Sequence, residues 1–188
     1  PHINELAKMS TKFLHAYSTH PRCLPARVSL LTGKYPVRFD VPQDPRFNYE
    51  NNRYYSLGQD AGTFGQVFKD EGYNTTYIGK WHATKRTGWP WQQGFDTSIG
   101  HSAKGNIKTY FPPYYINNQG NLLENFRNST KTKFRGQFHL TEELTNHAVK
   151  TIKNSKERPF LLVLSHYAVH TPIEAPEEEV EEYSEIFR

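Results

Sequence analysis

The sequence predicts an α/β layer fold in which helices flank a largely parallel central sheet. Helix-like and strand-like segments alternate along the 188 residues, which is the pattern of such folds. The run from Phe160 to Ser165 is apolar almost throughout, as in strands that parallel sheets bury. Candidate chemical groups follow three predicted strands, at the ends where sites of this fold class form. The length fits one domain or part of one.

The first segments read as a helix, a strand and a second helix. Ile3 to Met9 favours a short helix, and Phe13 to Ser18 favours a strand because aromatic side chains suit a pleated surface. The next helix begins at Cys23. Pro25 fits its first turn, where a missing N–H has no partner to lose. Gly33 follows its apolar run and predicts the helix end.

The middle of the chain predicts a loop, a helix and a strand. Tyr35 to Tyr55 is rich in Pro, Asn, Asp and Arg and reads as a surface loop. Thr63 to Glu71 has one apolar face, with Thr63 as its cap and Gly72 as its end. Tyr73 to Ile78 is then the second predicted strand.

The C-terminal half is less regular at first. Trp89 to Gly136 is aromatic and rich in turn residues, and we assign no regular structure there. Thr141 to Asn154 predicts a helix capped by Thr141. Phe160 to Ser165 predicts a strand buried on both faces. The acidic run after Pro176 predicts a solvated helix.

Charge and composition narrow the function classes. The formal charge is +4, and the last twelve residues carry six glutamates and one arginine, so the remainder carries +9. A basic body suits anionic substrates. The basic residues are scattered and form no nucleic-acid motif, so we expect no nucleic-acid partner. No apolar run approaches the ~20 residues of a membrane span, and a single cysteine excludes an internal disulfide.

That cysteine, Cys23, stands at the predicted start of a helix. Free backbone N–H groups and the helix dipole favour negative charge there. Arg27 comes four residues later, so a helix places both side chains on one face. A lone cysteine is ordinarily a small buried hydrophobe, but this setting lets a small anion contact both residues.

Several motifs together resemble the type I sulfatases. In family order they are Pro1-His2-Ile3-Asn4-Glu5-Leu6-Ala7 with Phe13 and Ala16-Tyr17, Cys23-Leu24-Pro25-Ala26-Arg27 with Leu30-Leu31-Thr32-Gly33, Gly72-Tyr73-Asn74-Thr75-Thr76-Tyr77-Ile78-Gly79-Lys80-Trp81-His82, Gly94-Phe95-Asp96, and His170-Thr171-Pro172. The resemblance implies an alkaline-phosphatase-like fold and hydrolysis of sulfate esters, on a sulfated small molecule or a glycan. It also implies an exported protein, whether periplasmic, secreted or lysosomal.

The resemblance assigns roles to five residues. Cys23 is the precursor of Cα-formylglycine, made by a formylglycine-generating or anaerobic sulfatase-maturating enzyme, and its hydrate is the nucleophile. Arg27 orients that group and offsets negative charge. Lys80 holds a sulfate oxygen. His82 bonds the second hydroxyl and takes its proton, as an imidazole can near neutrality. His170 contacts sulfate and protonates the leaving oxygen.

Two further histidines are weaker candidates. His166 lies nearer the strand end than His170 and ranks second to it, since a core histidine with satisfied hydrogen bonds explains it equally well. His101 follows the Gly-Phe-Asp motif, where family members often place a substrate-binding histidine. Lys104 or Lys108 can serve there instead.

The family binds one divalent cation, usually calcium, through carboxylate and amide oxygens. Of the implied ligands this chain carries only Cys23, as formylglycine. We therefore expect residues 1–188 to be part of a single sulfatase catalytic domain, without its N-terminal metal-binding strand and C-terminal portion. On its own this part should neither hold calcium tightly nor turn over substrate.

Three other interpretations stay open. A phosphonate monoester hydrolase or phosphodiesterase of the same superfamily also uses Cys-x-Pro-x-Arg. A catalytically inactive homologue would act as a binding module. A transferase that uses the same covalent intermediate is the third.

Overall fold

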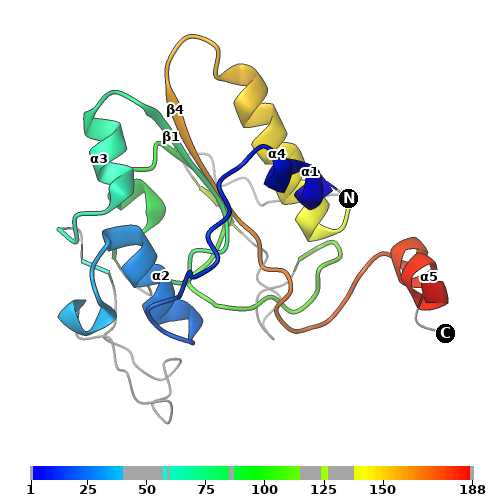
Figure 1. Cartoon of the computed structure of the whole chain (residues 1–188). Coiled ribbons are helices and arrows are strands. Elements are labelled where there is room, and N and C mark those ends of the chain that lie inside the picture. The colour runs from blue at the N-terminus through cyan, green and yellow to red at the C-terminus, as the bar shows by residue number, and fades with distance from the viewer. Residues whose placement is uncertain are drawn as a thin grey trace.

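The computed structural model describes residues 2–39, 57–58, 60–84, 87–114, 124–126 and 138–186. Within them a sheet lies between helices (Figure 1). The elements are α1 (His2–Lys8), α2 (Cys23–Thr32), the 3-10 turn η1 (Pro36–Phe39), α3 (Phe64–Asp70), β1 (Asn74–Gly79), the 3-10 turn η2 (Pro90–Gln92), β2 (Thr97–His101), β3 (Glu124–Phe126), α4 (Leu140–Asn154), β4 (Phe160–Ser165) and α5 (Glu177–Ile186). No helix in these ranges is both long and apolar enough to cross a bilayer.

The sheet has the strand order β3-β2-β1-β4. Strand β1 pairs in parallel with both β2 and β4, and β3 adds an antiparallel edge. The register of β1 on β4 runs from Asn74 opposite Phe160 to Gly79 opposite Ser165. Because the two strands end level, the residues that follow them emerge at one edge. The predicted α/β class with a largely parallel sheet is confirmed.

Strand β1 contributes side chains to two hydrophobic clusters, because successive side chains of a strand point to opposite faces of the sheet. Tyr77 packs with α2 side chains such as Leu24 and Val28. Ile78 packs with α4 side chains such as Leu144. In Figure 1, α2 and α3 accordingly lie on one side of the sheet and α4 on the other. These helices fix the sheet in a three-layer arrangement.

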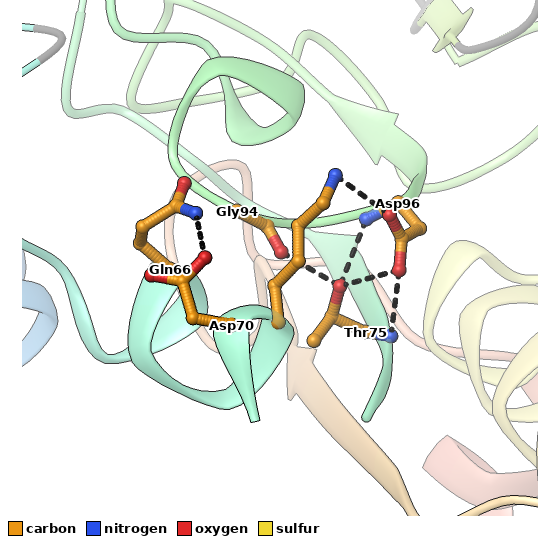
Figure 2. Close-up of polar contacts among 6 residues, drawn as sticks. Gln66, Asp70, Thr75, Gly94 and Asp96 are labelled. Carbon is orange, nitrogen blue, oxygen red and sulfur yellow. Dashed lines mark hydrogen bonds and ion pairs between the residues drawn. The ribbon is translucent and has the colours of Figure 1, made fainter. Parts of the chain in front are cut away.

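A polar network joins the starts of β1 and β2 (Figure 2). The hydroxyl of Thr75 donates to the carbonyl of Gly94 at 2.7 Å and accepts from the amide of Asp96 at 2.9 Å. The Asp96 carboxylate accepts from the amide of Thr75 at 3.3 Å and pairs with Lys69 at 2.8 Å. The network satisfies polar groups that the sheet would otherwise bury without partners.

Local sequence signals located several elements correctly. The predicted N-terminal helix is α1, and the acidic run forms α5. Helix α2 ends where Gly33 adopts φ of 67°, a left-handed conformation that glycine takes without a Cβ penalty. Thr63 caps α3 by accepting a hydrogen bond from the amide of Gln66. Each of these outcomes depends on residues close together in sequence.

One strand prediction was wrong, and one region without an assigned structure contains strands. Phe13 to Ser18 forms no strand, and its large apolar side chains are exposed. These residues favour a strand, but no strand of the described residues pairs with them. Conversely, Trp89 to Gly136 contains η2, β2 and β3. Of the predicted loop from Tyr35 to Tyr55, the first part holds η1, and residues 40–56 lie outside the described ranges.

Two finer expectations also need correction. Helix α4 is capped by His139 instead of Thr141, since the His139 Nδ1 accepts from the Thr141 amide at 3.4 Å. Strand β4 is not buried on both faces, because it is an edge of the described sheet. Phe160 is 38% exposed and Leu164 is 37% exposed.

Candidate active site

Cys23 opens helix α2 beside a cavity of about 730 Å³. Arg22 is the N-cap residue of the helix, and its backbone is extended, with φ of −99° and ψ of 147°. The buried face of α2 anchors the helix on the sheet, while Cys23 stays partly exposed. Arg27 and Ser165 line the same cavity. Cys23 and Arg27 therefore share one space, as their spacing predicted.

Arg27 connects α2 to the ends of two strands. Its Nη1 donates to the carbonyl oxygen of Lys80 at 2.6 Å and to the hydroxyl of Ser165 at 2.8 Å. The hydroxyl of Tyr77 accepts from the same nitrogen at 3.2 Å. The guanidinium thus lies where β1 and β4 end, next to the first turn of the helix that carries Cys23.

Lys80 follows β1 directly and is only 4% exposed. Burial lowers the pKa of its ammonium group, nearby Cys23 raises it, and Arg27 lowers it. Neither Lys80 nor Arg27 forms an ion pair with a carboxylate of the described ranges. Two cationic side chains without a carboxylate partner are an arrangement that favours a bound anion.

His82 is positioned by the segment that follows β2. Its backbone is in the left-handed region, with φ of 48°, and its amide donates to the carbonyl of Ser102 at 3.1 Å. The imidazole lies against Gly105, where an added Cβ would come within 2.5 Å of Nδ1. The orientation of His82 thus depends on a glycine more than twenty residues away in sequence.

His101 lies inside an aromatic enclosure. It is 1% exposed, with its ring 5.9 Å from Trp89 and 5.6 Å from Trp91, and those two indoles stack with each other. Burial lowers the pKa of His101 to about 4, so the imidazole is neutral at neutral pH. His101 does not line the cavity beside Cys23. The role of His101 as a substrate-binding residue therefore stays a prediction.

The two histidines after β4 differ in exposure. His166 is partly buried, and burial lowers its pKa. His170 is exposed, with its Nδ1 3.0 Å from the carbonyl oxygen of Thr171, and its own carbonyl accepts from Tyr110. Neither histidine lines the cavity beside Cys23, and neither do Lys104 and Lys108. Of the predicted site residues, Cys23 and Arg27 line this cavity, whereas Lys80 and His82 do not. Lys80 joins the group through its main-chain contact with Arg27, which also binds the hydroxyls of Tyr77 and Ser165.

A model of the Sulfatase family matches residues 1–188. The chain belongs to the sulfatase family. It is 32% identical to the ulvan-active sulfatase of Formosa agariphila over 92% of this chain and 31% of that protein. It is 28% identical to the N-acetylgalactosamine-6-sulfatase of Canis lupus familiaris, over 93% of this chain and 36% of that protein. This sulfatase chain thus spans about a third of the length of these curated relatives.

Solved structures agree with the sulfatase assignment. The crystal structure of Ps i-CgsB superposes with a TM-score of 0.77 at 27% identity, covering 100% of this chain and 44% of that one. The same protein in complex with k-i-k-neocarrahexaose gives a TM-score of 0.76, also at 27% identity, over 98% of this chain and 43% of that one. The alkaline-phosphatase-like fold implied by the motifs is confirmed for the part of the domain that this sulfatase chain represents.

The sulfatase family implies a divalent cation held by carboxylate and amide oxygens. In the described ranges, no three His, Cys, Asp or Glu side chains gather closely enough to hold a metal ion. The charged groups that interact around Cys23 include the cations Arg27 and Lys80. Cations repel a metal ion, so these residues do not by themselves form a calcium site.

Two residues that contact Arg27 at the candidate site, Tyr77 and Ser165, were not predicted to lie there. From the sequence, Tyr77 had no role beyond its place in a predicted strand and a family motif, and Ser165 was only the end of the apolar run. Their hydroxyls are 50 and 138 residues from Arg27 in sequence. The one available signal for Tyr77 was the alternation of side chains along the strand, which places Tyr77 on the face that α2 covers.

Proposed function

We propose that the complete protein hydrolyses sulfate esters through a formylglycine made from Cys23. The observation that carries this proposal is that two cations, Arg27 and Lys80, interact with each other's charge beside Cys23, with no carboxylate of the described residues to neutralise them. A sulfate group brings spread negative charge and several acceptor oxygens, which match this pair. Partial burial strengthens the attraction because the local dielectric is lower than that of water.

The position of Cys23 suits the modified residue. It lies at a helix N-terminus and lines a cavity large enough for a sulfate ester. When present, the hydrated aldehyde supplies a hydroxyl group that attacks sulfur. In our proposal, Lys80 holds a sulfate oxygen, and Arg27 orients the modified residue and offsets charge as the ester oxygen departs.

Two histidines complete the proposed proton transfers. His82, held against Gly105 near Lys80, takes a proton from the modified residue at its imidazole. His170, on the exposed loop after β4, gives a proton to the leaving oxygen. Imidazole suits both roles because its ordinary pKa lies near neutrality. Calcium, in this proposal, is held mainly by ligands from elsewhere in the complete protein.

We also propose that the substrate is a sulfated carbohydrate. Support comes from two relatives, one an ulvan-active sulfatase and one an N-acetylgalactosamine-6-sulfatase. The structure of Ps i-CgsB with k-i-k-neocarrahexaose is a further similar protein with a bound oligosaccharide.

The deciding experiment compares initial rates on an aryl sulfate and an aryl phosphonate. The complete protein is co-expressed with a maturation enzyme, and peptide mapping reads the state of Cys23. We expect faster sulfate cleavage, an aldehyde at Cys23, and no turnover by Cys23→Ala. Faster phosphonate cleavage would identify a phosphonate hydrolase instead. An intact thiol together with no turnover would identify a binding module.

A further inference from the structure

The hydroxyl of Tyr77 lies between the two cationic residues of the proposed site. It donates to the carbonyl oxygen of Lys80 at 2.6 Å and accepts from Nη1 of Arg27 at 3.2 Å. The side chain is only 2% exposed. A single buried phenol therefore links the main chain of Lys80 to the guanidinium of Arg27.

The aromatic ring of Tyr77 has little freedom to move this hydroxyl. Trp81 packs against it edge-on at 4.9 Å and 86°, and Phe95 does so at 5.2 Å and 70°. Burial raises the pKa of Tyr77, so the phenol stays protonated and donates to the Lys80 carbonyl. The phenol oxygen of Tyr77 can then accept a hydrogen bond from Nη1 of Arg27.

The guanidinium is held by one nitrogen only. Tyr77, Ser165 and the Lys80 carbonyl all contact Nη1 of Arg27. No described residue hydrogen-bonds Nε or Nη2 of Arg27. A guanidinium is a rigid planar fork, so fixing one nitrogen fixes the direction of the other N–H groups. Those groups remain for a ligand in the cavity that Arg27 shares with Cys23.

We propose that Tyr77 is a positioning residue that holds Arg27 so that its remaining N–H groups face the modified Cys23 and the sulfate bound there. Tyr77 does not touch the substrate. The role rests on the proposed sulfatase function, which it deepens by naming what orients the arginine. Ser165 contributes a second contact to the same nitrogen from the end of β4.

The test compares Tyr77→Phe with a matched control, Tyr114→Phe, in the complete protein. Tyr114 is also fully buried, and its hydroxyl donates to the carbonyl of Phe138, but it packs in the α4 cluster. Calorimetry with inorganic sulfate and initial rates on an aryl sulfate are the measurements. For Tyr77→Phe we expect sulfate binding about tenfold weaker and KM raised more than kcat falls, because a hydrogen bond to a charged group is lost. Tyr114→Phe should bind sulfate as wild type does, with a similar loss of melting temperature.

A double-mutant cycle with Arg27→Lys separates positioning from general stability. Lysine keeps the charge but has no planar fork to orient. If Tyr77 acts through Arg27, adding Tyr77→Phe to Arg27→Lys should weaken sulfate binding less than twofold, since coupled residues are not additive. A further tenfold loss in that background, or wild-type binding by Tyr77→Phe alone, would overturn the proposal while leaving the sulfatase function standing. Wild-type protein that neither binds sulfate nor cleaves aryl sulfates would overturn both.

Discussion

The backbone amide of Lys80 donates a 2.7 Å hydrogen bond to the carbonyl oxygen of Ser165. This bond continues the pairing of β1 with β4 one step beyond the last paired residues of the two strands. It brings Lys80 to the serine whose hydroxyl accepts from Arg27. The register of β1 on β4 therefore sets how the two cations of the proposed site lie relative to each other.

Replacing Lys80 by methionine should remove charge from the proposed site without loosening the fold. We expect kcat/KM for an aryl sulfate to fall about 100-fold, as when one preorganised donor to a charged group is lost. The free energy of unfolding should stay level or rise, because a nearly buried ammonium without a described carboxylate partner is removed. Initial rates and urea midpoints of the complete protein measure both effects.

The control is Lys153→Met on the exposed side of α4, which should change neither quantity. Unchanged kcat/KM for Lys80→Met would show that this lysine does not hold the sulfate.

Adding one methyl group at Gly105 should displace His82. The new Cβ would overlap the imidazole, coming within 2.5 Å of Nδ1. Since misplacing a catalytic group by about 1 Å can cost on the order of 100-fold, we expect Gly105→Ala to lower kcat for an aryl sulfate by about that factor. Gly58→Ala is the control, because a Cβ there meets nothing within 4 Å. Equal kcat values for the two variants would contradict the proposed dependence of His82 on Gly105.

His101 should make stability depend on pH in a defined window. Burial lowers its folded-state pKa to about 4, below the value of about 6.5 for an unfolded chain. Between these values the unfolded state binds more protons, so stability falls as pH falls from about 6.5 toward 4. The full effect is about 3 kcal/mol.

Urea unfolding of the complete protein at several pH values, with His101→Gln beside wild type, measures this contribution. The variant should lose less stability between pH 6.5 and 4 than wild type does. Parallel pH profiles for the two proteins would show that His101 is not the group responsible.

Thr75→Val should destabilise the fold through the network at the starts of β1 and β2. The variant keeps the side-chain shape but leaves the Gly94 carbonyl and the Asp96 amide without the Thr75 hydroxyl. Leaving buried polar groups unsatisfied costs about 1–3 kcal/mol, which denaturant unfolding measures. Thr97→Val, on an exposed position of β2, provides the comparison. A loss no larger than that of Thr97→Val would mean that the network contributes little.

Elements with a strong local signal were predictable, including strands β1 and β4, while β2 and β3, which depend on pairing with distant segments, were not. The end of α2 at Gly33 and the cap at Thr63 are short-range effects that single residues encode. Strand β2 contains glycine and histidine, so its propensity is weak, and its pairing with β1 stabilises it. Phe13 to Ser18 shows the reverse, since good strand residues stayed unpaired.

The residues of the candidate site also divide into those that the sequence predicted and those that it did not. Cys23, Arg27 and Lys80 belong to recognisable motifs, and the structure brings them together. The roles of Tyr77 and Ser165 depend on where strand ends meet a helix, which spacing within one segment does not reveal. The burial of His101 likewise follows from two tryptophans that flank it in space.

Lys80 and Arg27 interact without an opposing carboxylate from the described residues. This arrangement lowers the stability of the protein when no anion is bound. Mutual repulsion is retained in the native state and is relieved when a tetrahedral oxyanion enters. A ligand that binds only the folded form raises the melting temperature in proportion to the logarithm of its concentration above the dissociation constant. Phosphate or sulfate in the storage buffer should therefore act as a thermal protectant.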